Sequence, residues 1–114
     1  MSFSPKERDM ELARTIVEAH CAIQRYVEGM SSPDFLMDQK TQDAVCMRLQ
    51  QILECSAKLS ESVKGKLDIE WASLIAMRHK VSHHYVDVDP SVVWEVTQEF
   101  DEFKKLIDWA KENT

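Results

Sequence analysis

Apolar side chains recur at alternating steps of four and three residues along much of the chain, the spacing that gathers side chains on one face of an α-helix. The first such stripe consists of Leu12, Ile16, Ala19, Ile23 and Tyr26. It predicts a helix that starts at Ser4 and Pro5, a capping serine followed by a proline at the first helical position. Gly29 is the predicted end of this helix, because glycine accepts the left-handed backbone of a helix terminus.

A second stripe predicts a helix over residues 39–59, with Asp38 as a candidate N-terminal cap. The stripe consists of Val45, Leu49, Ile52, Ser56 and Leu59. The connector before this helix contains SSPDF, and we expect it to hold one helical turn after Pro33. The stretch SESVKGKLD after the helix is expected to break it, with Gly65 as the breaking residue.

The second half of the chain predicts two further helices. One begins near residue 69, carries Leu74, Met77 and Val81, and runs into the basic stretch RHKVSHHY. Asp89 and Pro90 predict the cap and first residue of a last helix. Its apolar stripe consists of Val93, Val96, Phe100, Phe103 and Ile107. Four helical segments with short connectors predict one all-α domain over residues 1–114, an antiparallel four-helix bundle with short additional helical turns.

Composition narrows the function classes. The chain has 114 residues, a net charge of −6 and only two glycines and three prolines, which favours long helices. A protein that coats nucleic acid is usually basic, so the charge argues against a DNA-coating role and leaves room for an enzyme that touches only a few phosphates. No apolar run approaches the ~20 residues that span a bilayer. The start, MSFSPKERDMEL, has no apolar signal core, and we expect a cytoplasmic protein without a membrane partner.

Three cysteines, Cys21, Cys46 and Cys55, lie in helical patterns without CxxC spacing. An odd number without a metal-binding spacing predicts small core residues in a reducing compartment. We therefore expect no metal site and no cofactor.

The stretch MRHKVSHHY concentrates the candidate chemistry of the chain. Arg78 keeps its charge and presents a planar fork suited to phosphate, and His83 can give or take a proton near neutral pH. The alternative is structural, since basic residues in the last turn of a helix also interact favourably with its dipole. His83 and His84 diverge by about 100° on a helix, so they are poor joint ligands for one metal ion.

Helical geometry constrains how these residues could meet. Arg78 and Tyr85 are seven residues apart and share a face of a continuous helix, whereas His83 would point about 140° away from Arg78. Arg78 and His83 therefore converge only if the helix ends near Ser82 or if they meet across a symmetric dimer. If the pair acts on RNA, the substrate supplies its own nucleophile, the 2′-hydroxyl, and the histidine transfers protons. One histidine cannot act as acid and base in a single pass, which is a chemical reason to expect a homodimer.

These residues also carry a family resemblance. The segment Arg78, His83, Tyr85 resembles the Rx4HxY motif of the HepT-like toxins, small all-helical proteins of the HEPN superfamily found in toxin–antitoxin pairs. The stretch YVEGMSSPDFLMDQKTQDAVCMRL, including TQDAV, resembles this family's helix–connector–helix region. The stretch DIEWASLIAMRHKVSHHYVDVDPSVVWEV resembles its motif region, including the tryptophan before the motif and VVWE after it. The resemblance covers nearly the whole chain.

The resemblance implies a metal-independent ribonuclease whose arginine and histidine meet at a homodimer interface. It also implies control by a nucleotidyltransferase antitoxin that transfers AMP to the motif tyrosine. Carried over to this chain, Arg78 and His83 become catalytic and Tyr85 becomes the AMP acceptor. His79, Lys80 and His84 add positive potential that supports RNA binding.

Two positions depart from the usual pattern. His79 stands where asparagine is common in the family, and it keeps a polar side chain there. His84 places a second base beside His83, which leaves the division of roles between the two histidines open. Two other functions stay open as well: a non-catalytic helical subunit that presents substrate or nucleotide to a transferase, and a bundle that only oligomerises. The Arg78 and His83 pair favours the enzyme, because a scaffold needs neither.

Overall fold

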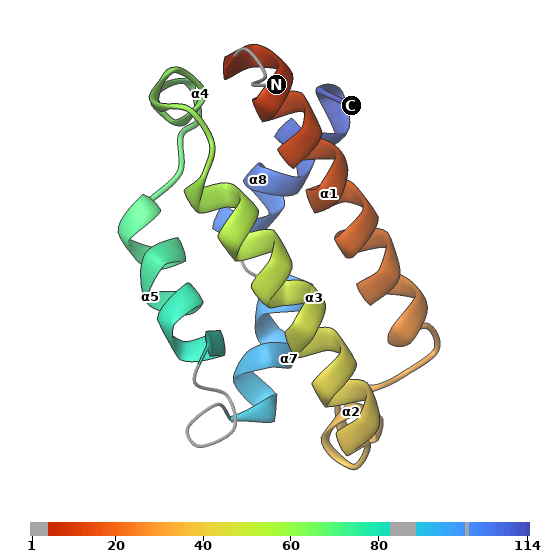
Figure 1. Cartoon of the computed structure of the whole chain (residues 1–114). Coiled ribbons are helices and arrows are strands. Elements are labelled where there is room, and N and C mark those ends of the chain that lie inside the picture. Colours follow the sequence, from red (N-terminus) through yellow and green to blue (C-terminus); the bar gives the residue numbers. More distant parts are fainter. Residues whose placement is uncertain (1–4, 83–88, 100) are drawn as a thin grey trace.

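The computed structural model describes residues 5–82, 89–99 and 101–114, and these ranges contain seven α-helices and no β-strand (Figure 1). The chain is therefore all-α, as the apolar pattern predicted. The helices are α1 (Pro5–Tyr26), α2 (Ser32–Leu36), α3 (Gln39–Ala57), α4 (Glu61–Lys66), α5 (Trp71–Ser82), α7 (Pro90–Glu99) and α8 (Asp101–Glu112).

Three long helices and the α7–α8 pair surround one core. α1 packs along α3 and α8, and α3 also packs against α5 and α7. Helices α1, α3 and α5 run in alternating directions, and α7 and α8 lie behind them in the view of Figure 1. The two chain ends lie at the same end of the molecule as α4.

Local sequence signals account for the ends of the helices. Gly29 has a φ of 76°, the left-handed conformation predicted for the end of the first helix. Ser31 and Asp34 form a reciprocal capping box at the start of α2. Asp38 caps α3, because its carboxylate accepts hydrogen bonds from the backbone N–H of Thr41 at 3.0 Å and from the Thr41 hydroxyl at 2.7 Å.

The predicted apolar stripes form the core. All five members of the second stripe are buried, including Ser56, whose hydroxyl donates to the Leu53 carbonyl at 2.7 Å. In the first stripe Ile16, Ala19 and Ile23 are buried, and Leu12 and Tyr26 pack against the core from its edge. The tryptophans at positions 71, 94 and 109 are half-buried against the same core.

The stretch 60–68 ends the preceding helix, as expected, but it forms a short helix of its own. Residues Glu61–Lys66 form α4, and Gly65 lies inside it. The helix starts there because the Ser60 hydroxyl accepts a hydrogen bond from the Val63 N–H, while buried Asp9 of α1 accepts hydrogen bonds from the Ser60 N–H and hydroxyl at 2.9 and 2.7 Å. A cap held from a neighbouring helix offsets the roughly 1 kcal/mol that glycine costs in a helix.

The predicted last helix is two helices in the structure. α7 ends at Glu99 and α8 begins at Asp101, and Phe100 of the predicted stripe lies outside the described residues. The halves have different neighbours: α7 packs against α2 and α3, whereas α8 packs against α1 and α5. The single-helix prediction was wrong because the repeat of apolar residues reports which face is buried and carries no information about which element buries it.

Within the described ranges, no helix is both long enough and apolar enough to cross a membrane.

Candidate active site

Helix α5 carries Arg78 and owes its position to its apolar face. Leu74 and Val81 are buried against the core, and Met77 packs beside them, so the helix is held against α3 along its length. Arg78 follows Met77 and is exposed. The helix therefore presents the arginine to solvent from a rigid support one turn before its C-terminal end.

Side chains of α8 hold the start of α5. The Glu102 carboxylate accepts a hydrogen bond from the Glu70 backbone N–H at 2.6 Å, and the Lys105 ammonium donates to the Asp68 carbonyl at 2.8 Å. The hydrogen bond from Glu70 is the main reason that the pKa of Glu102 lies below its usual value. Ile69, between these two contacts, is buried. The connector into α5 is thus tied to α8 through Asp68 and Glu70, and the buried Ile69 between them anchors it in the core.

Arg78 lines a cavity of about 250 Å³ between α3, α4 and α5. Its floor is mostly apolar, and the half-buried indole of Trp71 forms one wall. Lys64 of α4 places a second cation at the cavity, with its ammonium 5.8 Å above the Trp71 ring centroid. In the described part of the chain, no carboxylate lies within ion-pair distance of Arg78. Among the described residues, the cavity therefore holds two cations, Lys64 and Arg78, and no carboxylate.

The structure describes only some of the predicted site residues. His79 and Lys80 are exposed in the last turn of α5, where they also favour the helix dipole. Arg78 and Lys80 are about 200° apart around the helix, so they face different sides. His83, His84 and Tyr85 lie outside the described residues, so the meeting of Arg78 with His83 stays a prediction.

Both flanks of the segment that holds these three residues are anchored. Val81 is buried before it. After it, the Asp89 carboxylate accepts hydrogen bonds from the Ser91 N–H at 2.9 Å and from the Ser91 hydroxyl at 2.8 Å, which keeps the pKa of Asp89 below its usual value. The Asp89 carbonyl also accepts from the N–H of Val92 and Val93. Asp89 therefore caps the helix that starts at Pro90, as predicted.

The three cysteines are free, and two of them, Cys46 and Cys55, are poor candidate nucleophiles. Cys46 is buried, and burial raises the pKa of its thiol to about 11. Burial also raises the pKa of Cys55. A thiol with a raised pKa stays protonated and unreactive near neutral pH. Among the described residues, no group of three or more histidine, cysteine, aspartate or glutamate side chains is arranged to hold a metal ion.

Sequence reasoning missed the cavity beside Arg78. It gave neither Trp71 nor Lys64 a role at the site. One signal was present: Trp71 precedes Arg78 by seven residues, two helical turns, so both side chains lie on the same side of α5. The contribution of Lys64 depends on how α4 folds back over α5, which the apolar pattern does not report.

An all-α fold with an exposed arginine that has no carboxylate partner among the described residues is compatible with a phosphate-binding class of protein, and comparison with known proteins identifies the family. A family model described as "Ribonuclease HepT-like" matches residues 16–109. The chain therefore belongs to the ribonuclease HepT-like family, a family of RNA-cleaving enzymes, as its motif indicated.

Individual relatives agree with this assignment. A protein named "Probable ribonuclease HepT" from Thermococcus cleftensis is 33% identical over 95 residues, which is 82% of this chain and 86% of the relative. A protein of Methanocaldococcus jannaschii whose name describes an RNase is 28% identical over 119 residues, covering 96% of this chain and 98% of the relative. No solved structure matches the chain with significance.

Proposed function

We propose that this protein is a metal-independent endoribonuclease that acts as the toxin of a cytoplasmic toxin–antitoxin pair. Arg78 and His83 are its catalytic residues, and His79, Lys80 and His84 support RNA binding. The observation that carries the proposal is the position of Arg78, exposed on a rigid helix without a described carboxylate partner, in a chain whose family is named for ribonuclease activity.

The reaction follows from the two residue types. A neutral His83 accepts the proton of the ribose 2′-hydroxyl, whose oxygen attacks the adjacent phosphorus, and a protonated His83 donates a proton to the leaving 5′-oxygen. The fork of Arg78 stabilises the charge that develops on the phosphoryl oxygens. Since one histidine cannot hold both protonation states at once, the second copy comes from the other protomer of a homodimer.

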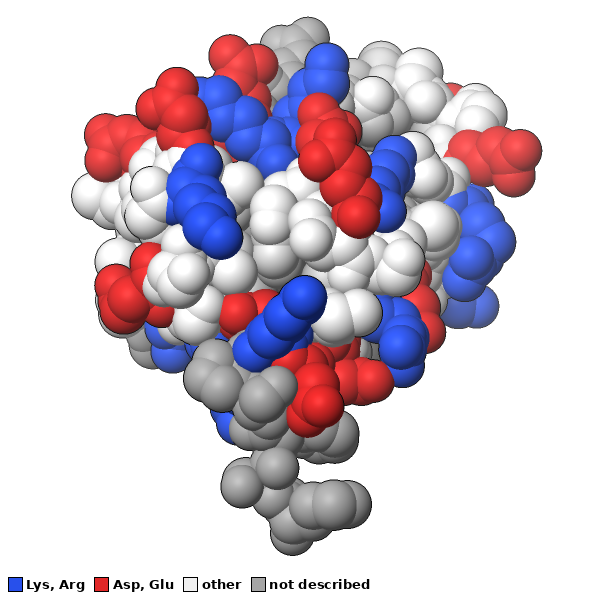
Figure 2. All heavy atoms as spheres, turned by 90° about the horizontal axis from the view of Figure 1, so that it is seen from above, with Lys and Arg blue, Asp and Glu red and all other residues white. Residues whose placement is uncertain are grey.

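Individual basic side chains, rather than the net charge of the protein, must bind the substrate. The net charge is −6, and basic and acidic side chains are interspersed at the end of the bundle formed by α4 (Figure 2). An acidic protein has no broad field that attracts RNA, so binding depends on individual cations that face the substrate. Arg78 is exposed one turn before the end of α5, and His79 and Lys80 are exposed in its last turn, next in sequence to the segment that carries His83.

The proposed partner is a nucleotidyltransferase antitoxin that transfers AMP from ATP to Tyr85. The added group brings a negative phosphodiester and a bulky base close to Arg78 if the helix continues to Tyr85. The guanidinium then pairs with the attached phosphate in place of RNA phosphate, and the base obstructs the site. This mode of control needs no large change in the fold.

Cleavage of RNA in excess EDTA tests the proposal. The purified protein should cut RNA and leave DNA of the same sequence intact, because DNA lacks the 2′-hydroxyl. Arg78→Ala and His83→Ala should each lose activity while their circular dichroism spectra stay unchanged, and Arg8→Ala, an exposed arginine at the start of α1, is the matched control. Full activity in His83→Ala would exclude the assigned chemistry. A folded wild-type protein that binds RNA and does not cut it would instead be a non-catalytic binding subunit.

A further inference from the structure

The cavity beside Arg78 has a composition that suits a nucleobase flanked by phosphates. Its apolar floor includes Leu53 and Leu74, and its two cations, Lys64 and Arg78, come from different helices. Its volume of about 250 Å³ lies just below the ~300–1,000 Å³ of pockets for drug-sized molecules. A single base fits this size and this mixture of apolar wall and cation better than a larger ligand does.

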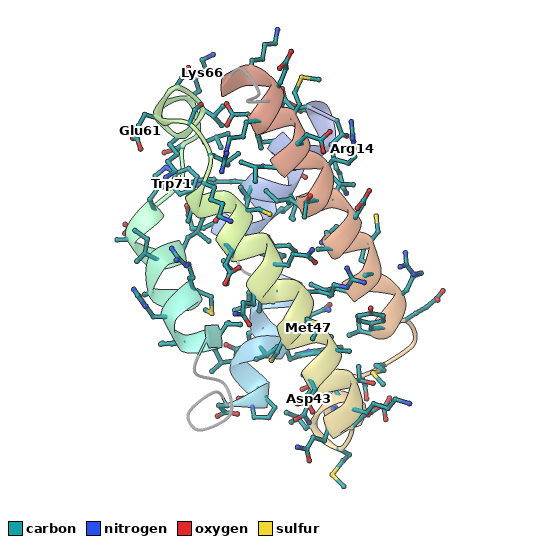
Figure 3. The ribbon with its side chains drawn as sticks, viewed as in Figure 1. Arg14, Asp43, Met47, Glu61, Lys66 and Trp71 are labelled. Atoms are coloured by element: carbon teal, nitrogen blue, oxygen red, sulfur yellow. The ribbon has the colours of Figure 1, made fainter. Side chains whose placement is uncertain are left out.

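The wall at Trp71 is held in place before any ligand arrives. Its indole N–H donates to the Lys64 carbonyl at 3.3 Å, and the ring packs against the core. Figure 3 shows Trp71 where the first turn of α5 approaches α4. A partly exposed indole with a fixed position is the kind of surface on which RNA-binding proteins stack bases.

Lys64 lines the cavity, and its ammonium lies over the Trp71 ring, 5.8 Å from the centroid, so a base that stacks on this face moves the ammonium aside. Its side chain is only 23% exposed, and its ammonium donates to the Ala57 carbonyl at 2.9 Å. Its carboxylate neighbour, Glu61, lies at 3.9 Å and is 94% exposed, which makes the ion pair weak. Lys66, two residues later on the same helix, is exposed and lines a different cavity, between α1, α4 and α8. Helix α4 therefore carries one lysine that lines this cavity and one that does not.

We infer that this cavity is a base-binding subsite for the RNA substrate, with Trp71 as the stacking wall and Lys64 as a second phosphate contact beyond Arg78. Arg78 belongs to both the cavity and the proposed reaction centre, so a base held here is a near neighbour of the scissile phosphate. The subsite therefore selects which nucleotide lies beside the cut. The inference rests on the proposed ribonuclease function and adds to it the determinant of base preference.

Binding of a non-cleavable RNA tests the subsite separately from catalysis. The probe is a fluorescently labelled hexanucleotide with 2′-O-methyl groups, titrated by anisotropy at several salt concentrations. Lys64→Met keeps the apolar stem and should lower the slope of log K against log salt by about 0.7, the value for one lost phosphate contact on a single strand. Lys66→Met, the control, should leave the slope unchanged. Trp71→Leu should weaken binding roughly 5- to 150-fold, and Trp71→Phe should retain most of it.

Cleavage of unmodified oligonucleotides that differ only at the nucleotides flanking the cut provides the second readout. Trp71→Leu and Lys64→Met should flatten the base preference of the wild-type protein, and Lys66→Met should preserve it. Variants with wild-type affinity, salt slope and base preference would overturn the subsite and leave the ribonuclease intact. A protein that binds the methylated probe through Trp71 but cuts no RNA would overturn the ribonuclease and leave the subsite.

Two further outcomes are decisive. If free 5′-AMP binds as tightly as the hexanucleotide and with the same dependence on Trp71, the cavity is a mononucleotide site and the RNA assignment is wrong. If Trp71→Leu does not fold, as judged by circular dichroism, the salt slope of Lys64→Met against Lys66→Met decides alone, because neither lysine contributes to the buried core.

Discussion

Glu102 on α8 accepts a hydrogen bond of 2.6 Å from the backbone N–H of Glu70, the residue directly before α5. The carbonyl of Glu70 in turn accepts from the Ser73 N–H at 3.0 Å, in the first turn of the helix. A carboxylate on one helix therefore caps the helix that carries Arg78. The contact satisfies a backbone N–H that would have no partner within α5, and it favours negative charge at a helix N-terminus.

Replacing this carboxylate should loosen the start of α5. Glu102→Ala should lower the midpoint of thermal unfolding by about 4 °C, the size expected for one lost cap in a chain of this length. Glu112→Ala, an exposed glutamate near the end of the same helix, is the control and should change little. Differential scanning calorimetry gives the comparison. Equal midpoints for the two variants would mean that Ile69 and Lys105 alone hold the connector.

The same contact predicts that the free energy of unfolding decreases at acid pH. The folded protein holds the pKa of Glu102 below its ordinary value of 4.5, chiefly through the Glu70 hydrogen bond. The unfolded state therefore binds more protons below that pH, and the stabilisation, complete above 4.5, is lost as the pH falls through the folded value. Glu102→Gln should show a shallower decline of stability between pH 5 and pH 3 in urea titrations, whereas Glu112→Gln should follow the wild type.

His20 predicts a second pH effect in a milder range. Its Nδ1 is buried and has no hydrogen-bond partner among the described residues, and its ring lies against Phe103 with centroids 6.2 Å apart. Burial lowers its pKa from 6.5, Lys111 lowers it further and Asp108 opposes the shift. The unfolded state therefore takes up a proton more readily, so stability should fall as the pH drops below 6.5.

Removing this titrating group should flatten that dependence. His20→Leu should reduce the loss of unfolding free energy between pH 7 and pH 5.5, because leucine carries no proton to exchange. His79→Leu, at an exposed position of α5, should leave the dependence as it is in the wild type. Urea midpoints at several pH values measure the effect. A His20→Leu protein with the wild-type slope in this range would show that another group is responsible.

A homodimer that shares its histidines should be sensitive to one inactive subunit. Light scattering should report about twice 13.2 kDa. When wild-type and His83→Ala subunits are co-expressed in equal amounts and exchange freely, about one quarter of the dimers have His83 in both subunits. Activity should then fall to about one quarter of the wild-type value, rather than the one half expected if each subunit acts alone. A value near one half would show that one subunit contains a complete site.

Control through Tyr85 can be separated from catalysis. A phenol with a pKa near 10 is a poor nucleophile at pH 7, so modification requires a transferase that supplies its own base and Mg²⁺-bound ATP. Co-expression with the proposed transferase should add the mass of one or more AMP units at Tyr85 and silence cleavage. Tyr85→Phe should still cut RNA and should escape the transferase. Silencing of Tyr85→Phe by the active transferase would point to inhibition by complex formation or through another residue.

Local sequence predicted the core faces of the first two long helices and several of the helix ends. The apolar stripes named the core faces of α1 and α3, and Gly29, Asp38 and Asp89 marked helix ends that the structure confirms. Burial periodicity, capping and the left-handed glycine depend on residues within a turn or two of each other, so they can be deduced without knowing the fold. The motif at Arg78 was visible for the same reason, since its residues lie within eight positions.

Contacts between distant residues needed the tertiary structure. The Asp9 and Ser60 pair that starts α4, the Glu102 and Glu70 pair that caps α5, and the division of the last helix all join elements whose neighbours the sequence does not state. The cavity shared by Lys64 and Arg78 is of the same kind, because the two cations meet only through the packing of α4 and α5. A repeat in sequence specifies which face of a helix leaves water. The packing of whole helices specifies what that face meets, since many partners offer the same gain from burial.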